Sequence, residues 1–315
     1  MRKKNKIGDA TPWTLIIGIS FLIAGFIVVL YFLGVFNFGE TKDDELCHES
    51  VLLRSTHDLT TYAVPLDCKT GYLCISADGT CESMTSPTIK KVTEVSDVYK
   101  ILGEEMTNCW WMFGEGNVKY VSEQVTSELY CSICDQIGFD DSLKTLFSNG
   151  NISKASLYGY LAVNNVSGED TTYLNYLLGT STSQEITRLL KQDSSDYGKL
   201  DLTFGNIVVG KRYFVVMGVF NDISAWKTAV TAGLGGAALV AGSVIVIAAT
   251  AGAVLPAVPF IIAFIAGGTA GSTQGYLIAV GTKGNTGKDY LSPSIIEANS
   301  EDYNKLQCVD VVTLS

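Results

Sequence analysis

The stretch WTLIIGISFLIAGFIVVLYFLGVF, residues 13–36, contains 24 consecutive residues without a charge. As an α-helix it would be roughly 36 Å long, enough to cross the apolar core of a bilayer, which is about 30 Å thick. Arg2, Lys3, Lys4 and Lys6 precede it, and four acidic residues between positions 40 and 45 follow it. Because basic flanks stay on the cytoplasmic side, this pattern predicts a cytoplasmic amino terminus and an exported chain beyond the span.

A cleaved signal peptide has a shorter apolar region, of about 7 to 15 residues, and a cleavage site with small residues. The longer run therefore predicts an uncleaved signal anchor, with a basic cytoplasmic tail at 1–12 and a transmembrane helix at 13–38. We expect the rest to be α+β: a small cysteine-rich β module, helices and a β-hairpin. The expected order is the cysteine-rich module at 39–92, the main exported domain at 93–226, an apolar segment at 227–282 and an exported tail at 283–315.

The chain has eight cysteines, an even number that in an exported protein predicts a disulfide framework. Proximity predicts a bridge between Cys74 and Cys81, around a turn at Asp78 and Gly79, because glycine adopts positive φ without cost. The remaining expectations are that Cys109 pairs with Cys131 or Cys134 and that Cys308 pairs within the module at 39–92. The complete set is Cys47, Cys68, Cys74, Cys81, Cys109, Cys131, Cys134 and Cys308.

Apolar residues recur at three- and four-residue spacing from Ser96 to Phe113, which predicts a helix capped by Ser96 and ended by Gly114. Trp110 lies at the edge of the apolar stripe, whereas Trp111 falls on the polar side, close to Glu104 and Thr107. Such a tryptophan is either covered by another part of the domain or faces a partner or the membrane interface. Trp111 is therefore a candidate partner-facing residue.

Shorter patterns follow. They predict helices at 143–147, 155–163, 173–178 and 186–191, and strands at 200–204 and 212–220, the second of them central because it is apolar on both faces. Asn151 and Asn165 each begin an Asn-x-Ser triplet and are candidate glycosylation sites if this region is exported.

Residues 228–282 form a run of 55 residues without a charge. As one helix it would be roughly 80 Å long, too long for a bilayer, so it must fold back. Pro256 and Pro259 divide it into apolar lengths at 229–255 and 260–280, which predicts a transmembrane helical hairpin that returns the tail to the outside. Small residues four apart allow helices to pack closely in lipid; here they are Gly267, Gly271 and Gly275.

Catalytic and metal-binding patterns are weak. Cys131 and Cys134 have the C-x2-C spacing of a dithiol that exchanges disulfides, but residues 136–225 contain no proline of the kind that faces a thioredoxin-type site. His48 and His57 lack the paired spacing of a zinc site. The carboxylates Glu104, Glu105 and Glu115 are more typical of a solvated helix face than of general acid–base chemistry. The sequence assigns no cofactor, and whether the chain is an enzyme stays open.

Two further patterns exclude classes of ligand. The net charge of -10 disfavours a nucleic-acid partner, because phosphate binding requires a concentrated basic face. GTKGNTGK at 281–288 partly matches a phosphate-binding loop, but its first and last glycines are one residue too far apart. In addition, Asp289 stands where a serine or threonine would hold magnesium.

Three segments together resemble a family of single-anchor, exported archaeal proteins with no established activity. The segments are VLLRSTHDLTTYAVPLDCKTGYLC at 51–74, EEMTNCWWMFGEG at 104–116 and YCSICDQIGFDD at 130–141, and the resemblance covers about residues 47–220. It implies a location in the cell envelope and supplies no catalytic residues.

Three functions are therefore open. The first is a membrane-anchored, extracytoplasmic cell-surface protein with a binding or structural role, whose partners are the bilayer, other envelope proteins or a second copy through the glycine-rich helices. The second is a pore-forming or membrane-remodelling protein that acts through the hairpin at 228–282. The third is an exported thiol-disulfide oxidoreductase that uses Cys131 and Cys134.

Overall fold

The computed structural model describes residues 17–23, 25, 43–56, 65–121, 128–191, 200–220, 244–248, 260–266, 273–286 and 288–310. The chain divides into two compact units, Met1–Lys42 and Asp43–Ser315. In the first unit, residues 17–23 are helical, and their apolar side chains are exposed, with Phe21 and Leu22 each 75% accessible. Among the described residues, no helix combines the length and the apolar character needed to cross a bilayer. Most of the predicted span at 13–38 lies outside the described residues.

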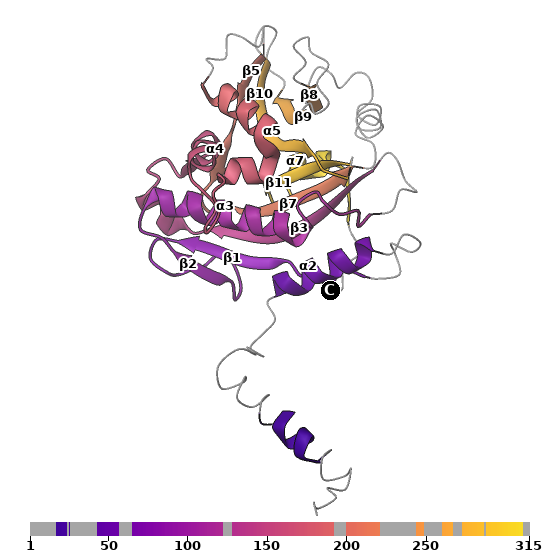
Figure 1. The fold of residues 1–315 in the computed structure, drawn as a ribbon. Helices are drawn as coiled ribbons and strands as arrows, with labels where there is room; N and C mark the ends of the chain where they lie inside the picture. Colours follow the sequence, from indigo (N-terminus) through magenta and orange to yellow (C-terminus); the bar gives the residue numbers. More distant parts are fainter. Residues whose placement is uncertain are drawn as a thin grey trace, which may run out of the picture. The chain divides into compact units, whose positions relative to one another are not determined.

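The second unit is built on a ten-stranded mixed sheet, so the predicted α+β class is confirmed (Figure 1). The main order of strands is β2-β1-β3-β7-β11-β10-β9-β8, with β12 beside β3 and β5 beside β10. These strands span Gly71–Ser76 (β1), Thr88–Lys91 (β2), Leu129–Phe139 (β3), Leu200–Thr203 (β5), Arg212–Phe220 (β7), Val244–Ala248 (β8), Phe260–Ala266 (β9), Thr273–Lys283 (β10), Asp289–Glu297 (β11) and Cys308–Asp310 (β12). A second, two-stranded sheet pairs β4 (Asn151–Ser153) with β6 (Asn206–Val208).

The central position predicted for 212–220 is confirmed. β7 pairs antiparallel with β3 on one side and with β11 on the other. Val215, Val216 and Met217 are all fully buried, because both faces of the strand are covered. β1 also pairs with β3, so the cysteine-rich stretch at 39–92 and the region after it share one sheet.

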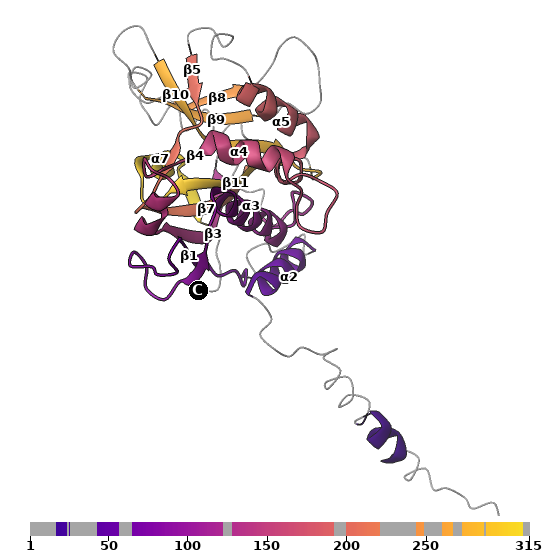
Figure 2. The same cartoon turned by 90° about the vertical axis from the view of Figure 1, so that its left-hand side faces the viewer.

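Four helices lie on one side of the strands β1, β3, β7 and β11 (Figure 2). They are α2 (Asp43–Ser55), α3 (Val95–Met112), α4 (Lys154–Val163) and α5 (Tyr173–Lys191). Helix α3 was predicted to begin two residues too late: Glu94, not Ser96, is its N-cap, and Glu94 and Asp97 form a reciprocal capping box. Gly103 lets α4 and α5 approach α3 closely, because a Cβ there would lie 2.9 Å from a methyl group of Leu161.

The short patterns after β3 are confirmed with small changes. The predicted turn of helix at 143–147 is the 3-10 helix η1 (Asp141–Thr145), and 155–163 is α4. The two helices predicted at 173–178 and 186–191 form a single element, α5, which is interrupted at Gly179 (φ 70°). One short helix near the end of the chain, α7 (Glu301–Lys305), was not predicted.

Helix α2 corrects the expectation that residues 41–91 form only turns and strands. Its first turn carries Asp43, Asp44 and Glu45, which are favourable at the positive end of a helix. Its buried face consists of Cys47, Val51 and Arg54, so a cysteine and an arginine replace two of the apolar residues that mark an amphipathic helix. The apolar period was therefore too weak to reveal the helix.

The predicted helical hairpin at 228–282 is wrong where the structure describes it. β9 and β10 occupy the length assigned to the second helix, 260–280, and β8 lies inside the first, 229–255; the three strands pair antiparallel. The run is rich in valine and isoleucine, and an apolar stretch of this kind does not distinguish a buried strand from a buried helix by its period. Gly275 lies on β10 between Leu202 and Ile265, while Gly267 and Gly271 lie outside the described residues.

All eight cysteines are described, and each belongs to a disulfide. The bridges join Cys47 to Cys68, Cys74 to Cys81, Cys109 to Cys134 and Cys131 to Cys308. The predictions for Cys74 and Cys109 are confirmed. The partner predicted for Cys308, in the module at 39–92, is wrong, because β12 runs parallel to the start of β3 and brings Cys308 to Cys131.

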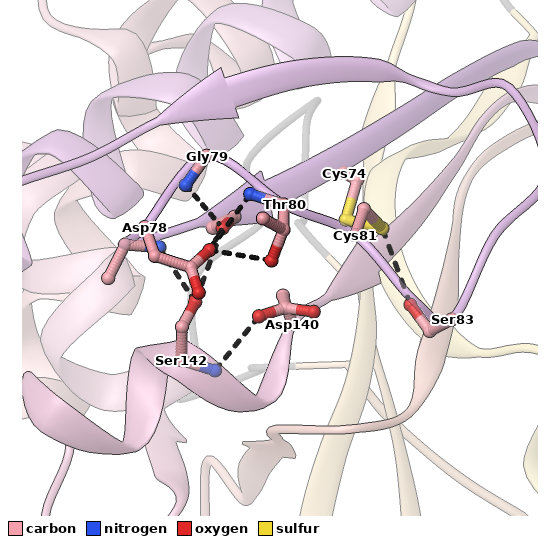
Figure 3. Close-up of a disulfide and its surroundings, with 10 residues drawn as sticks. Cys74, Asp78, Gly79, Thr80, Cys81, Ser83, Asp140 and Ser142 are labelled. Carbon is pink, nitrogen blue, oxygen red and sulfur yellow. Dashed lines mark hydrogen bonds between the residues drawn. A yellow bond between two sulfur atoms is a disulfide. The ribbon is translucent and has the colours of Figure 1, made fainter.

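The predicted turn between Cys74 and Cys81 is also confirmed (Figure 3). Gly79 has φ +91°, and the Asp78 carboxylate accepts hydrogen bonds from the backbone and side chain of Thr80, each at 2.8 Å. These bonds, together with one from Ser76, lower the pKa of Asp78 to about 2. Ser142 of η1 accepts a hydrogen bond from the backbone of Ala77 and so ties the turn to the main sheet.

Candidate functional site

A pocket with a volume of about 320 Å³ opens on the outer side of α3, between that helix, the loop after α4 and the start of α5. Its size is at the lower end of the range for small-molecule sites, about 300–1,000 Å³. Aromatic rings and a few polar groups line it together, as in pockets that orient a ligand. The lining residues are Glu104, Thr107, Asn108, Trp111, Val166, Ser167, Tyr173 and Tyr176.

Helix α3 supplies half of the lining. Glu104, Asn108 and Trp111 are spaced by four and three residues, so they lie on one face of the helix. Thr107 lies between them, and its hydroxyl group donates to the backbone carbonyls of Gly103 at 3.0 Å and Glu104 at 2.9 Å. The polar side of α3 identified in the sequence is therefore the floor of this pocket.

Helix α2 holds this face of α3 in place. The imidazole of His48 stacks on the indole of Trp111, with ring centroids 4.2 Å apart and planes at 11°. His48 Nδ1 also lies 2.7 Å from the carbonyl oxygen of Trp111, and Asn108 Nδ2 donates to Asp44 Oδ2 at 3.0 Å. Trp111 is thus covered on one side by the domain itself, and it remains half-buried at the pocket.

Helix α5 supplies Tyr173 and Tyr176, one turn apart. Tyr173 is almost fully buried, and Tyr176 is half-buried and donates its phenolic hydrogen to Glu115 Oε1. Glu115 has φ 55°, and glycines with positive φ stand on both sides of it. This left-handed turn ends α3 and directs the Glu115 carboxylate back to α5.

Negative charge dominates the surroundings of the two tyrosines. Burial raises the pKa of Tyr173, and the charge of Glu104 raises it further, while a hydrogen bond with Ser167 acts in the opposite direction. Burial also raises the pKa of Tyr176, followed by its hydrogen bond to Glu115 and the charges of Glu115 and Glu169. Lys100 Nζ lies 3.8 Å from Glu104 at an exposed position, where an ion pair contributes little.

The structure separates the three carboxylates considered as catalytic candidates. Glu104 lines the pocket and Glu115 contacts Tyr176 beside it, whereas Glu105 is not part of the lining and interacts electrostatically with Asp44 and Asp135. Burial raises the pKa of Glu105, and the charges of Asp44 and Glu104 raise it further, while Lys90 lowers it. The three glutamates do not converge on one point, so no acid–base pair is formed by them.

The other predicted sites are distributed over the domain. Cys131 and Cys134 lie on β3 and are bonded to different partners, so they do not form the dithiol of an oxidoreductase. His48 packs on Trp111, and His57 is outside the described residues; within the described part of the chain no group of three or more histidine, cysteine or acidic side chains is arranged to hold a metal ion. Asn151 and Asn165 are both exposed.

Comparisons with known proteins give no relative: no family model, no curated protein and no solved structure matches the chain. The interpretation of the site therefore depends on its geometry. Sequence reasoning identified Trp111 but missed Tyr173 and Tyr176, which read as part of an ordinary apolar helix face. No local pattern could place them beside Trp111, about sixty residues away.

Proposed function

We propose that this chain is a membrane-anchored, extracytoplasmic protein that binds a small ligand, or an exposed group of a larger one, in the pocket between α3 and α5. The observation that carries the proposal is the lining of that pocket. Trp111 and Tyr176 offer aromatic surface from two helices, with Tyr173 almost fully buried in the wall. Glu104, Asn108 and Ser167 offer polar groups around this surface. Aromatic residues with a few placed polar groups are typical of ligand sites.

Binding is favoured over catalysis by the solvent exposure of the carboxylate that lines the pocket. The Glu104 side chain is 44% accessible and lies near Lys100, so it is well solvated. General acids and bases need a positioned partner within hydrogen-bond reach. Glu104 has the environment of a recognition group instead.

The extracytoplasmic location is supported by two features of the sequence and the fold. The apolar run at 13–36 follows four basic residues, as in a cytoplasmic-in signal anchor. All eight cysteines form disulfides, which persist in oxidising compartments and are rare in the cytosol of mesophiles. The resemblance to anchored, exported archaeal proteins agrees with this location.

Thiol labelling tests the location. Intact cells that express the full chain are treated with a mild reductant and then with a membrane-impermeant maleimide. We expect labelling before lysis, including at Cys81, which is the half-exposed member of its bridge. A variant with an added cysteine in place of Lys4 should have that thiol labelled only after lysis. The opposite pattern would contradict the proposed orientation.

Ligand-observed NMR tests the binding role. The full chain in mild detergent is mixed with three probes of different charge: choline, D-glucose and inorganic phosphate. We expect at least one probe to show saturation transfer from the wild-type chain, and the signal to be lost in Trp111→Ala and in Tyr176→Ala, because each change removes a ring from the pocket. Tyr72→Ala is the matched control, since Tyr72 is 55% exposed and lies on β1. If no probe shows a signal, the pocket is not a ligand site and the proposed function fails.

A further inference from the structure

We propose that the pocket recognises an organic cation, an alkylammonium group such as that of choline or of a methylated lysine side chain. This inference rests on the proposed function and specifies the chemistry of its ligand. It follows from the combination of aromatic rings and carboxylates around one concavity.

The aromatic rings form the first part of the argument. Trp111 and Tyr176 are half-buried at the pocket and come from two helices, and Tyr173 lies almost fully buried in the pocket wall. His48 covers one side of the Trp111 indole at a centroid distance of 4.2 Å. The face of an aromatic ring carries partial negative charge, so a cation within about 6 Å of a ring centroid is attracted to it, most strongly by tryptophan. Rings from two helices provide this attraction from more than one side.

The carboxylates form the second part. Glu104 lines the pocket, Glu115 accepts the hydrogen bond of Tyr176, and Asp44 accepts the hydrogen bond of Asn108. Each lies in the pocket wall or one residue behind it, on a different structural element: α3, the turn after α3, and α2. A ligand in the pocket therefore enters a region of negative potential, which favours a positive group and disfavours an anion.

The polar contacts distinguish an ammonium from a sugar. Two donors near the pocket are already engaged: the Tyr176 hydroxyl hydrogen is donated to Glu115, and one of the two amide hydrogens of Asn108 is donated to Asp44. A sugar needs free donors and acceptors in pairs to replace its hydrogen bonds to water, because an unpaired buried polar group costs free energy. An alkylammonium ion needs ring faces and negative charge, and the pocket supplies both.

The test compares choline with 3,3-dimethylbutan-1-ol, a molecule of the same shape in which a neutral carbon atom replaces the charged nitrogen. Affinities are measured by calorimetry on the full chain in mild detergent. We expect choline to bind about tenfold more tightly or better, because the two probes differ in charge and not in size. The variant Glu104→Gln should weaken choline binding severalfold and leave the neutral probe unchanged. Glu82→Gln, at an exposed position between Cys81 and β2, is the matched control and should change neither.

The outcomes separate this inference from the proposed function. If the two probes bind equally, or if D-glucose binds and choline does not, the cation inference is overturned and a binding role survives. If choline, D-glucose and phosphate all fail to bind, both are overturned. A charge preference that survives in Trp111→Ala would also overturn the inference, because binding would then occur elsewhere.

Discussion

Replacing Cys131 and Cys308 together by alanine is expected to lower the free energy of unfolding by about 5 kcal/mol. In the chain-entropy description, a disulfide stabilises a protein by restricting its unfolded chain, and the effect grows with the length of the closed loop. Cys131 and Cys308 are separated by 177 residues, for which that description gives about 5 kcal/mol at 25 °C. Because many domains have a total stability of only about 5–15 kcal/mol, the double variant should be close to unfolding.

The bridge between Cys74 and Cys81 provides the matched comparison. Its separation is 7 residues, for which the same description gives about 2 kcal/mol. Urea unfolding of the full chain, followed by circular dichroism under non-reducing conditions, measures both effects. The prediction is that Cys131→Ala with Cys308→Ala shifts the transition much further than Cys74→Ala with Cys81→Ala. Equal shifts would show that local packing, and not loop closure, determines what these disulfides contribute.

The same bridge shows what the sequence could and could not predict. The even number of cysteines predicted that Cys308 has a partner in the main domain, and this prediction is correct. The helical hairpin that was expected to return the tail to the same side of the membrane is wrong. Which cysteine bonds to Cys308 depends on the pairing of β12 with β3, which brings together segments 177 residues apart. No local pattern encodes such a register, so proximity in the sequence led to the wrong cysteine.

Patterns within a single element were predictive where the apolar residues had a clear arrangement, on one face of a helix or on both faces of a central strand. The helix around 96–113 and the central strand at 212–220 both formed as expected, because the spacing of apolar residues is different in the two segments. Helix α2 was missed because Cys47 and Arg54 occupy its buried face. The run at 228–282 was misassigned because an uncharged stretch of valine, isoleucine and glycine satisfies the criteria for a membrane helix and for a buried strand alike.

The candidate site was predicted only in part, for a related reason. Trp111 stood out because a large apolar ring on a polar helix face is unusual, and it does line the pocket. Tyr173 and Tyr176 gave no such signal. They become part of a site only because Gly103 allows the start of α5 to pack against α3, with a Cβ at that position 3.2 Å from the Tyr173 ring.

The second large effect concerns Asp135, which lies beneath α3 on β3. The side chain is 9% exposed, and its Oδ2 has no hydrogen-bond partner among the described residues. It stands opposite Gly71 on β1, where an added Cβ would overlap the carboxylate, so the absence of a side chain at Gly71 makes room for it. The adjacent Cys109–Cys134 bridge joins α3 to β3 at this level.

Burial raises the pKa of Asp135 to about 7, and the negative charges of Glu105 on α3 and Asp44 on α2 raise it further. Lys90 on β2 lowers the pKa of Glu105 and so acts against this effect at the neighbouring acid. An acid whose pKa is raised on folding binds more protons in the folded state than in the unfolded state. The free energy of unfolding is therefore greatest below the unfolded pKa of this group, about 4, and declines as the pH rises toward 7.

Asp135→Asn removes this dependence, because asparagine is neutral at every pH. We expect the advantage of the variant over the wild type to grow from about 2 kcal/mol at pH 5 to about 4 kcal/mol at pH 8, since the unfolded carboxyl group ionises above pH 4 and each pKa unit corresponds to about 1.4 kcal/mol. Asp170→Asn, at an exposed position, is the control and should show no such difference between the two pH values. If Asp135→Asn is destabilising at pH 8, the carboxylate is stabilised as an anion, and the buried acid contributes to folding in its charged form.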